Sequence, residues 1–311
     1  MKTDLSILKE MKETYPDLNI EENPDMSKYT SFRAGGRAAA LVIADCESQL
    51  SAILQCLNEN KTPHIILGNG SNTLFADEGY DGVVIKLGRD FEKITFDGTK
   101  VTCGCSLLLS AMAKGMMERE LTGFEFASGI PGSFGGALFM NAGAYGGEMK
   151  DVVVSVKAMS SDGTEIKTFS GEEMGFGYRH SVLQDNNYIA LEGVVQLEKG
   201  EKEAIRETMA DLTHRRNTKQ PMDYPSAGST FKRPEGYFAG KLIEDSGMKG
   251  ISVGGAQVST LHSGFVINKG GATATDIVQL IKLIQNTVYD KFGVRLQPEV
   301  RIIGSQGYEN K

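Results

Sequence analysis

Apolar residues in the N-terminal part of the chain switch between helical and strand spacing. The spacing predicts a short amphipathic helix over 4–15, a strand over 37–44, a helix over 50–57 and a second strand over 64–67. A strand, a helix and a strand in this order predict a parallel crossover connection. The second strand ends in the sequence GNGSN at 68–72, which we call the GNGSN turn.

The middle of the chain carries the signals of antiparallel strands. An apolar run predicts a strand over 83–87, and the alternating apolar residues around Asp97-Gly98 and Asp162-Gly163 predict two hairpins. Helical spacing predicts a helix over 106–119, and a further strand covers 188–198. Hairpins combined with a helix indicate a mixed α+β unit.

The last third of the chain combines helices with short strands. We expect a helix over 201–217, two more over about 237–246 and 275–292, and a strand over 298–304. In the first of these helices the positions expected to face inward are Ala204, Ile205, Thr208, Met209 and Leu212.

The chain divides into units where the pattern changes. Its 311 residues are enough for two or three domains. We expect an N-terminal unit over 1–80, a second unit over 81–200, a connecting helix over 201–218 and a C-terminal domain over 219–311. Apart from the connecting helix, these units mix helices and strands, so the expected fold class is α+β.

Composition and charge argue against several classes of protein. The net charge is −7, which argues against a nucleic-acid partner. The N-terminus MKTDLSILKE lacks the apolar stretch of a signal peptide, and the longest uncharged stretch, near 251–268, is too polar to span a membrane. Cys103 and Cys105 form a CGC sequence without metal-ligand spacing, so we expect reduced cytoplasmic thiols and no metal site.

Residues 123–147 form a Gly-rich run that stands out from the rest of the chain. Eight of its 25 residues are Gly, and its only charged residue is Glu125. Because each Gly costs about 0.5–1 kcal/mol in a regular element, we expect neither an ordinary helix nor a strand here. Gly lets backbone N–H groups approach a ligand, which suits a large, flat, anionic cofactor. A plain surface loop is the alternative, against which the apolar residues of the run argue.

The GNGSN turn is a second candidate for cofactor binding. Its N–H groups could hold a pyrophosphate at the end of a parallel strand. It is not the dinucleotide fingerprint, because Thr73 occupies the third Gly position, and it lacks the Lys-Ser/Thr pair of a Walker loop. Together with the Gly-rich run, it could hold one cofactor from two sides.

Residues 214–241 are basic in an acidic protein. Six Lys and Arg residues surround the hydroxyl-rich sequence SAGSTF at 226–231, which fits a substrate that bears phosphate or carboxylate. A solvated basic surface is the alternative. Arg179 in GYRH and Glu299 in QPEVRIIG are, by local sequence alone, more typical of surface groups.

Several motifs then occur in one characteristic order. They are GNGSN, SGIPGSFGGA, NAGAYG, YR, AGSTFKRP, AGKLIEDSG, ATA and LQPEVRIIG. In this order they resemble the UDP-N-acetylenolpyruvoylglucosamine reductase family over roughly 27–304. The chain is similar to the shorter form of that family, because only eight residues separate Arg179 from the strand at 188 and leave no room for a lid loop with its Tyr.

This resemblance implies a fold and a set of binding residues. The fold would be a two-subdomain FAD-binding fold of the vanillyl-alcohol-oxidase type, which is not a Rossmann fold, plus a C-terminal α+β substrate domain. The FAD-binding region would span about 32–198. Non-covalent FAD would be held by Gly68, Asn69, Gly70, Ser71, Asn72, Ser128, Gly129, Ile130, Gly132, Ser133, Gly136, Asn141 and Ala144. The substrate would be held by Lys219, Arg233 and Arg301, and Arg233 stands where the longer form has Asn.

The resemblance also implies a reaction. The protein would be a cytoplasmic, NADPH-dependent oxidoreductase that acts on a CH–CH bond in peptidoglycan precursor synthesis. A hydride would pass through FAD N5 to C3 of the enolpyruvyl ether, and Ser229 would protonate C2. Arg179 and Glu299 would stabilise the charge that develops between these steps. The expected partners are small molecules, with no nucleic acid, membrane or obligatory protein partner.

Two other functions stay open from the sequence alone. A flavin-dependent oxidase of the same superfamily would share the cofactor loops but should lack the AGSTFKRP and PEVR sequences. A flavin-free protein that binds nucleotide sugars would differ by its colour, because only a flavoprotein is yellow.

Overall fold

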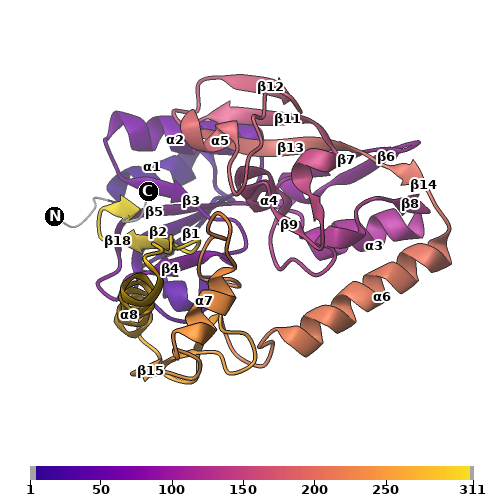
Figure 1. Ribbon diagram of the computed structural model, residues 1–311. Helices are drawn as coiled ribbons and strands as arrows, with labels where there is room; N and C mark the ends of the chain where they lie inside the picture. The colour runs from indigo at the N-terminus through magenta and orange to yellow at the C-terminus, as the bar shows by residue number, and fades with distance from the viewer. Residues whose placement is uncertain (1–4, 309–311) are drawn as a thin grey trace.

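A four-stranded sheet forms the first layer of the fold (Figure 1). The structure is a computed structural model that describes residues 5–308. The strand order is β1-β2-β5-β3, with bounds Asn19–Glu22, Ala38–Ala44, Tyr80–Leu87 and His64–Ile66. Helices α1 (Ser6–Thr14) and α2 (Glu47–Glu59) bury apolar residues such as Leu8, Leu50 and Leu54 together with those of β2 and β5.

The predicted crossover is parallel, but its two strands are not neighbours. Strands β2 and β3 both pair in parallel with β5, which lies between them. We expected the strand over 83–87 to belong to the second unit of the chain. It is instead β5, an inner strand of this first sheet. Four consecutive residues of β5 are buried, namely Gly82, Val83, Val84 and Ile85, so both faces of the strand are covered. This is typical of a central parallel strand.

A five-stranded antiparallel sheet forms the second layer. Its order is β12-β11-β13-β7-β6, with bounds Ile166–Ser170, Val153–Ser160, Tyr188–Gln196, Lys100–Gly104 and Ile94–Asp97. Both hairpins predicted from Asp-Gly pairs are confirmed as β6–β7 and β11–β12. The shorter elements of this region are α3 (Leu109–Glu118), β8 (Leu121–Thr122), α4 (Phe134–Met140), β9 (Gly143–Ala144), β10 (Gly147–Glu148), α5 (Val182–Asp185) and β14 (Glu198–Lys199).

The expectation that the Gly-rich run contains no helix is wrong. Residues Phe134–Met140 form α4, although Gly135 and Gly136 lie in its first turn. Close packing explains why glycine occupies position 135, because a Cβ there would lie 3.0 Å from Cys105 Cβ and 3.1 Å from the carbonyl oxygen of Cys105. The helix packs against β13, where Gly193 leaves room for the Phe134 ring. The entropy cost of Gly is thus outweighed by tertiary contact.

Helix α6 (Lys202–Lys219) connects the second layer to the C-terminal domain (Figure 1). Of its five positions expected inward, only Ile205 is buried, Met209 and Leu212 are half-buried, and Ala204 and Thr208 are exposed. The helix lies against the short 3-10 turn Glu125–Ala127 and α3 rather than in a core, so a narrow contact replaces the broad apolar face that the sequence predicts.

The C-terminal domain packs two helices against small strands. Helix α8 (Ala274–Phe292) and α7 (Ala239–Asp245) contact each other, and the sheet β15-β16-β17 covers Ser252–Val253, Ala256–Val258 and Val266–Asn268. The chain then returns to the N-terminal part, where β18 (Arg301–Gly304) pairs in parallel with β4 (Thr73–Phe75) and antiparallel with β19 (Gly307–Tyr308). This pairing brings residues near 299 beside the GNGSN turn.

The first layer also caps the long helix of the C-terminal domain. Asp77 accepts hydrogen bonds from the backbone N–H groups of Ala274 and Thr275 at 2.8 and 2.7 Å. Asn268 donates to the carbonyl of Phe32 at 3.0 Å. These contacts fix the C-terminal domain against the N-terminal strands, and no helix in the described part of the chain is long and apolar enough to cross a membrane.

Candidate active site

The GNGSN turn and the Gly-rich run meet directly. Asn69 Nδ2 donates to the carbonyl of Pro131 at 2.7 Å. A Cβ on Gly68 would lie 2.6 Å from Ser133 Oγ, and a Cβ on Gly132 would lie 3.8 Å from Ser71 Oγ. The two loops expected to hold one cofactor from two sides are therefore in contact.

Gly70 is the position at which this turn most clearly requires glycine. Its φ is +65°, and a Cβ there would lie 2.0 Å from the carbonyl oxygen of Tyr29. The carbonyl of Gly70 accepts from the N–H of Ser31 at 3.1 Å. The segment around Tyr29 lies so close to Gly70 that a side chain at this position would clash with it, and this contact determines the conformation of the turn.

Several buried polar atoms near these loops have no hydrogen-bond partner in the described part of the chain. They include Thr30 Oγ1, Ser31 Oγ, Ser128 Oγ and Arg216 Nε. The first two adjoin Gly70, and Ser128 precedes Gly129 in the Gly-rich run. Buried polar atoms without partners are rare in native folds unless a ligand or water satisfies them. Their placement fits a large polar cofactor such as FAD.

Arg216 is a site residue that the sequence reasoning did not select. A Cβ on Gly129 would lie 3.2 Å from Arg216 Cδ, and burial lowers the pKa of this guanidinium. Its neighbour Arg215 instead pairs with Asp211 at 2.7 Å on the exposed side of α6. The basic segment 214–241 contained the signal, but only the packing of α6 shows which arginine faces the loop.

Asn141 links the Gly-rich run to the turn that carries Arg179. It is fully buried, and its amide donates to Glu148 Oε2 at 2.6 Å and to the carbonyl of Gly177 at 2.9 Å. Gln184 extends the link, since its amide donates to the carbonyls of Phe139 at 2.7 Å and of Arg179 at 3.1 Å. The end of α4 therefore positions the Arg179 turn.

Arg179 and Glu299 form a pair, although 120 positions separate them in the sequence. Arg179 Nε donates to Glu299 Oε1 at 2.7 Å, and the side chains are only 22% and 14% exposed. Burial raises the pKa of the Glu299 carboxyl, and the positive charges of Arg179 and Lys232 oppose that rise. Arg179 has φ +56°, so its backbone adopts the left-handed region that few residues occupy.

Backbone pairing places Thr230, the residue that follows Ser229, against Glu299. The N–H of Glu299 donates to the carbonyl of Thr230 at 2.8 Å, and Phe231 bridges to Pro298. Thr230 is buried, and its Oγ1 accepts from the N–H of Val266 at 2.9 Å. Ser229 itself is exposed, so its hydroxyl is accessible to a substrate.

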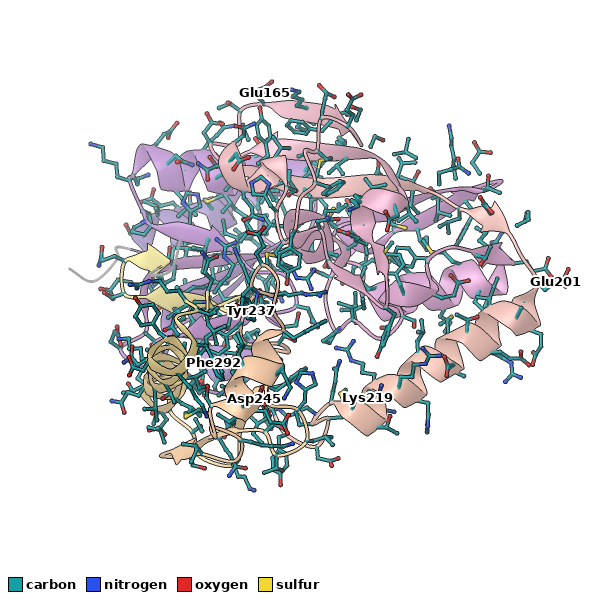
Figure 2. The ribbon with its side chains drawn as sticks, viewed as in Figure 1. Glu165, Glu201, Lys219, Tyr237, Asp245 and Phe292 are labelled. Carbon is teal, nitrogen blue, oxygen red and sulfur yellow. The ribbon has the colours of Figure 1, made fainter. Side chains whose placement is uncertain are left out.

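The remaining cations expected at the substrate site lie in different settings. Arg301 stacks over the Phe139 ring at 4.7 Å, and the Arg233 guanidinium stacks over Phe238 at 4.0 Å. The hydroxyl of Tyr178 accepts from the backbone N–H of Arg233 at 3.0 Å. Lys219 is exposed at the C-terminal end of α6, at the opposite end of the helix from Glu201 (Figure 2).

A small cationic cavity adjoins Arg233. It has a volume of about 230 Å³, and its lining residues are Lys232, Arg233, Pro234, Glu235, Arg295 and Gln297. A larger cavity of about 420 Å³ lies near the start of α2 and shares no lining residue with this one. The smaller cavity is the positively charged one, and the charge of Lys232 in its lining also acts on Glu299.

The other residues expected to bind the cofactor line the two loops. Asn72 Nδ2 donates to the carbonyl of Glu299 at 3.0 Å, which ties the GNGSN turn to the Arg179–Glu299 pair. Ser133 caps α4, and its hydroxyl accepts from the N–H of Gly136 at 3.5 Å. Ile130 and Ala144 are half-buried in the Gly-rich run. Their contacts to a cofactor stay predictions.

Comparisons with known proteins agree with this site. One family model, described as FAD binding domain, matches residues 38–168. Another, described as the C-terminal domain of UDP-N-acetylenolpyruvoylglucosamine reductase, matches residues 220–303. The first model confirms the expected FAD cofactor and the α+β FAD-binding fold.

Individual relatives match nearly the whole chain. A protein of Alkaliphilus oremlandii named UDP-N-acetylenolpyruvoylglucosamine reductase is 52% identical over 290 residues, which cover 93% of this chain and 95% of that protein. A protein of Clostridium perfringens with the same name is 50% identical over 300 residues, covering 96% and 98%. The solved structure of the reductase from Thermus caldophilus aligns with a TM-score of 0.79 and 33% identity, covering 92% and 99%.

These relatives share the length of the chain as well as its sequence. The resemblance drawn from the ordered motifs is therefore confirmed, and so is the expectation of an oxidoreductase. The protein belongs to the UDP-N-acetylenolpyruvoylglucosamine reductase family of FAD-dependent enzymes.

Proposed function

We propose that this enzyme reduces the enolpyruvyl ether of UDP-N-acetylenolpyruvoylglucosamine to UDP-N-acetylmuramate with NADPH as the reductant. The names of the relatives support the substrate. The observation that carries the proposal is the half-buried Arg179–Glu299 pair, with the Ser229 segment paired to Glu299 and two Gly-rich loops in contact beside it. The product is a peptidoglycan precursor, which makes the cytoplasm the expected location.

The two loops are proposed to hold the FAD. The GNGSN turn and residues 128–136 would bind its diphosphate through backbone N–H groups, because these loops meet and leave polar atoms unpaired. When bound, FAD supplies the hydride acceptor and donor that no side chain can provide. The protein supplies orientation, charge and protons.

The catalytic residues act on the enolpyruvyl group. As negative charge develops at C2 and its carboxylate, Arg179 would stabilise it with a fixed positive charge. In its protonated form, which burial favours, Glu299 would donate a hydrogen bond to the same group. Ser229 would deliver a proton to C2. Because a free hydroxyl is a weak acid, nearby cations such as Lys232 would stabilise the alkoxide character that Ser229 develops.

The cationic cavity is proposed to hold the diphosphate of the nucleotide sugar. Arg233 lines it, and Lys232 and Arg295 add positive charge. Lys219 and Arg301 are proposed to complete the binding of the substrate. The aromatic stacking of Arg233 on Phe238 and of Arg301 on Phe139 keeps both guanidinium groups extended.

The visible spectrum of the purified protein tests this proposal. We expect a flavin spectrum that bleaches with NADPH under anaerobic conditions and returns when the UDP-enolpyruvyl sugar is added. Rapid return with air alone would indicate a flavin-dependent oxidase instead. A colourless protein that still binds the nucleotide sugar would contradict the flavoenzyme.

We predict that the FAD is bound without a covalent bond. Covalent attachment in flavoproteins of this kind uses His or Cys, and neither occurs in 65–75 or 123–147. Precipitation by acid or heat should therefore release all the flavin into the supernatant. Flavin that stays on the denatured chain would show that this prediction is wrong.

We also predict that NADPH and the sugar nucleotide use overlapping space. Both ligands carry a diphosphate, and the sequence offers one cation-rich segment for them, residues 214–241 together with Arg301. Plots of initial rate at varied NADPH should be parallel, with inhibition at high substrate, as in a ping-pong mechanism. Intersecting lines would indicate a ternary complex and two separate binding sites.

A further inference from the structure

Lys86 contacts the GNGSN turn from the first sheet. It belongs to β5, the central strand of the first sheet, which pairs in parallel with β3 through Ile66 and Ile85. Because of this register, the residues that follow β3 run alongside Lys86 where the chain enters the turn. Lys86 Nζ donates to the carbonyl oxygen of Gly68 at 2.7 Å.

Among residues 5–308, no carboxylate forms an ion pair with the ammonium group of Lys86. The residue is half-buried, and burial alone lowers the pKa of its side chain. Within residues 5–308, its contact is with an uncharged carbonyl group. A partly buried lysine normally pairs with an acidic group. Because Lys86 contacts a neutral carbonyl instead, its positive charge remains available to an anion.

Other contacts also hold the GNGSN turn. Asn69 donates to the carbonyl of Pro131, Gly68 packs against Ser133, and the N–H of Ser31 donates to Gly70. Lys86 adds a contact from β5 at the first residue of the turn, and the N–H of Arg301 in β18 donates to the carbonyl of Asn72, the last residue, at 2.9 Å. The carbonyl of Gly68 is thereby directed toward the sheet.

We propose that Lys86 is a positioning residue for the FAD diphosphate. Its ammonium group holds the Gly68 carbonyl toward the sheet, so that the following N–H groups of the turn face the ligand. Its ammonium group lies at Gly68, the residue before Asn69, which contacts the other loop. A positive charge at this place favours a dianionic group. This inference rests on the placement of the diphosphate at the GNGSN turn in the proposed function.

Titration of the FAD-free protein with FAD tests this role. Lys86→Met should raise the Kd for FAD, followed by flavin fluorescence, roughly 10- to 100-fold, as expected for losing one charge-assisted hydrogen bond. The Kd should also depend less on salt in the variant than in the wild type. Lys86→Arg, which keeps charge and donors, should restore most of the affinity. Lys100→Met, which removes an exposed lysine of β7, is the matched control and should leave the Kd unchanged.

The outcomes separate this inference from the proposed function. If wild-type protein does not bind FAD, both fail. If the wild type binds and Lys86→Met has the same Kd and the same salt dependence, only the role of Lys86 is refuted. If Lys86→Met does not fold, Lys86→Gln, which can still donate a hydrogen bond but carries no charge, decides the question. A salt dependence equal to that of the wild type in Lys86→Gln would overturn the proposal.

Discussion

Replacing Ser229 with alanine should slow turnover by roughly 10²–10⁴-fold, the usual span for losing a positioned acid. The reduction of bound flavin by NADPH should be nearly unchanged, because that step needs no proton at C2 of the sugar substrate. Ser229 is exposed, and the neighbouring Thr230 anchors this segment through Val266, so the fold should tolerate the change. Stopped-flow absorbance of the flavin measures each half of the reaction separately.

Ser226→Ala is the matched control for this experiment. Ser226 carries a hydroxyl on the same loop but lies at the bridge to Ile267, three residues before Ser229. The control should retain both half-reactions. If Ser229→Ala reoxidises with substrate at the wild-type rate, Ser229 is not the acid. If it loses reduction by NADPH equally, the loop shapes the whole pocket and the specific role is wrong.

The sequence predicted the local elements better than their arrangement. Hairpins at Asp97-Gly98 and Asp162-Gly163 formed as predicted, because their turn residues determine the local backbone. The pairing of β18 with β4 had no local signal. It depends on parallel contact between segments more than two hundred residues apart, and it brings Glu299 to the GNGSN turn.

Packing also explains the elements that were predicted wrongly. The helix α4 contains Gly135 because Cys105 leaves no room for a side chain, a contact that composition cannot show. The exposed faces of α6 follow from its position between two parts of the protein. In both cases tertiary contact outweighed the intrinsic preference of the residues.

The candidate site shows the same division. Ordered motifs identified Arg179, Ser229 and Glu299 through a family resemblance, whereas their local sequences favoured surface groups. The structure then brought Arg179 and Glu299 into contact. Arg216 and Lys86 belong to no motif, and only their contacts with Gly129 and Gly68 place them beside the two loops. Residues of this kind are found only when the packing is known.

Replacing Glu299 with alanine should lower kcat by roughly 10²–10³-fold, the range found when one donor to a developing oxyanion is lost. Glu299→Gln should lose far less, because the amide can still donate a hydrogen bond. Burial raises the pKa of Glu299, so the protonated donor persists to higher pH than for an exposed carboxyl group. Wild-type activity should therefore fall as pH rises through this raised pKa, and the Gln variant should lack that fall.

Stability should follow the same titration. A folded-state pKa above the unfolded value gives a stabilising contribution that is fully present below the unfolded pKa and is lost as pH rises through the folded one. The stability of the wild type relative to Glu299→Gln should thus decrease over that window, measured by denaturant unfolding at several pH values. If Glu299→Gln is as slow as Glu299→Ala at every pH, the reaction requires the carboxylate charge that pairs with Arg179. Glu299 would then act by orienting Arg179 rather than by donating a hydrogen bond.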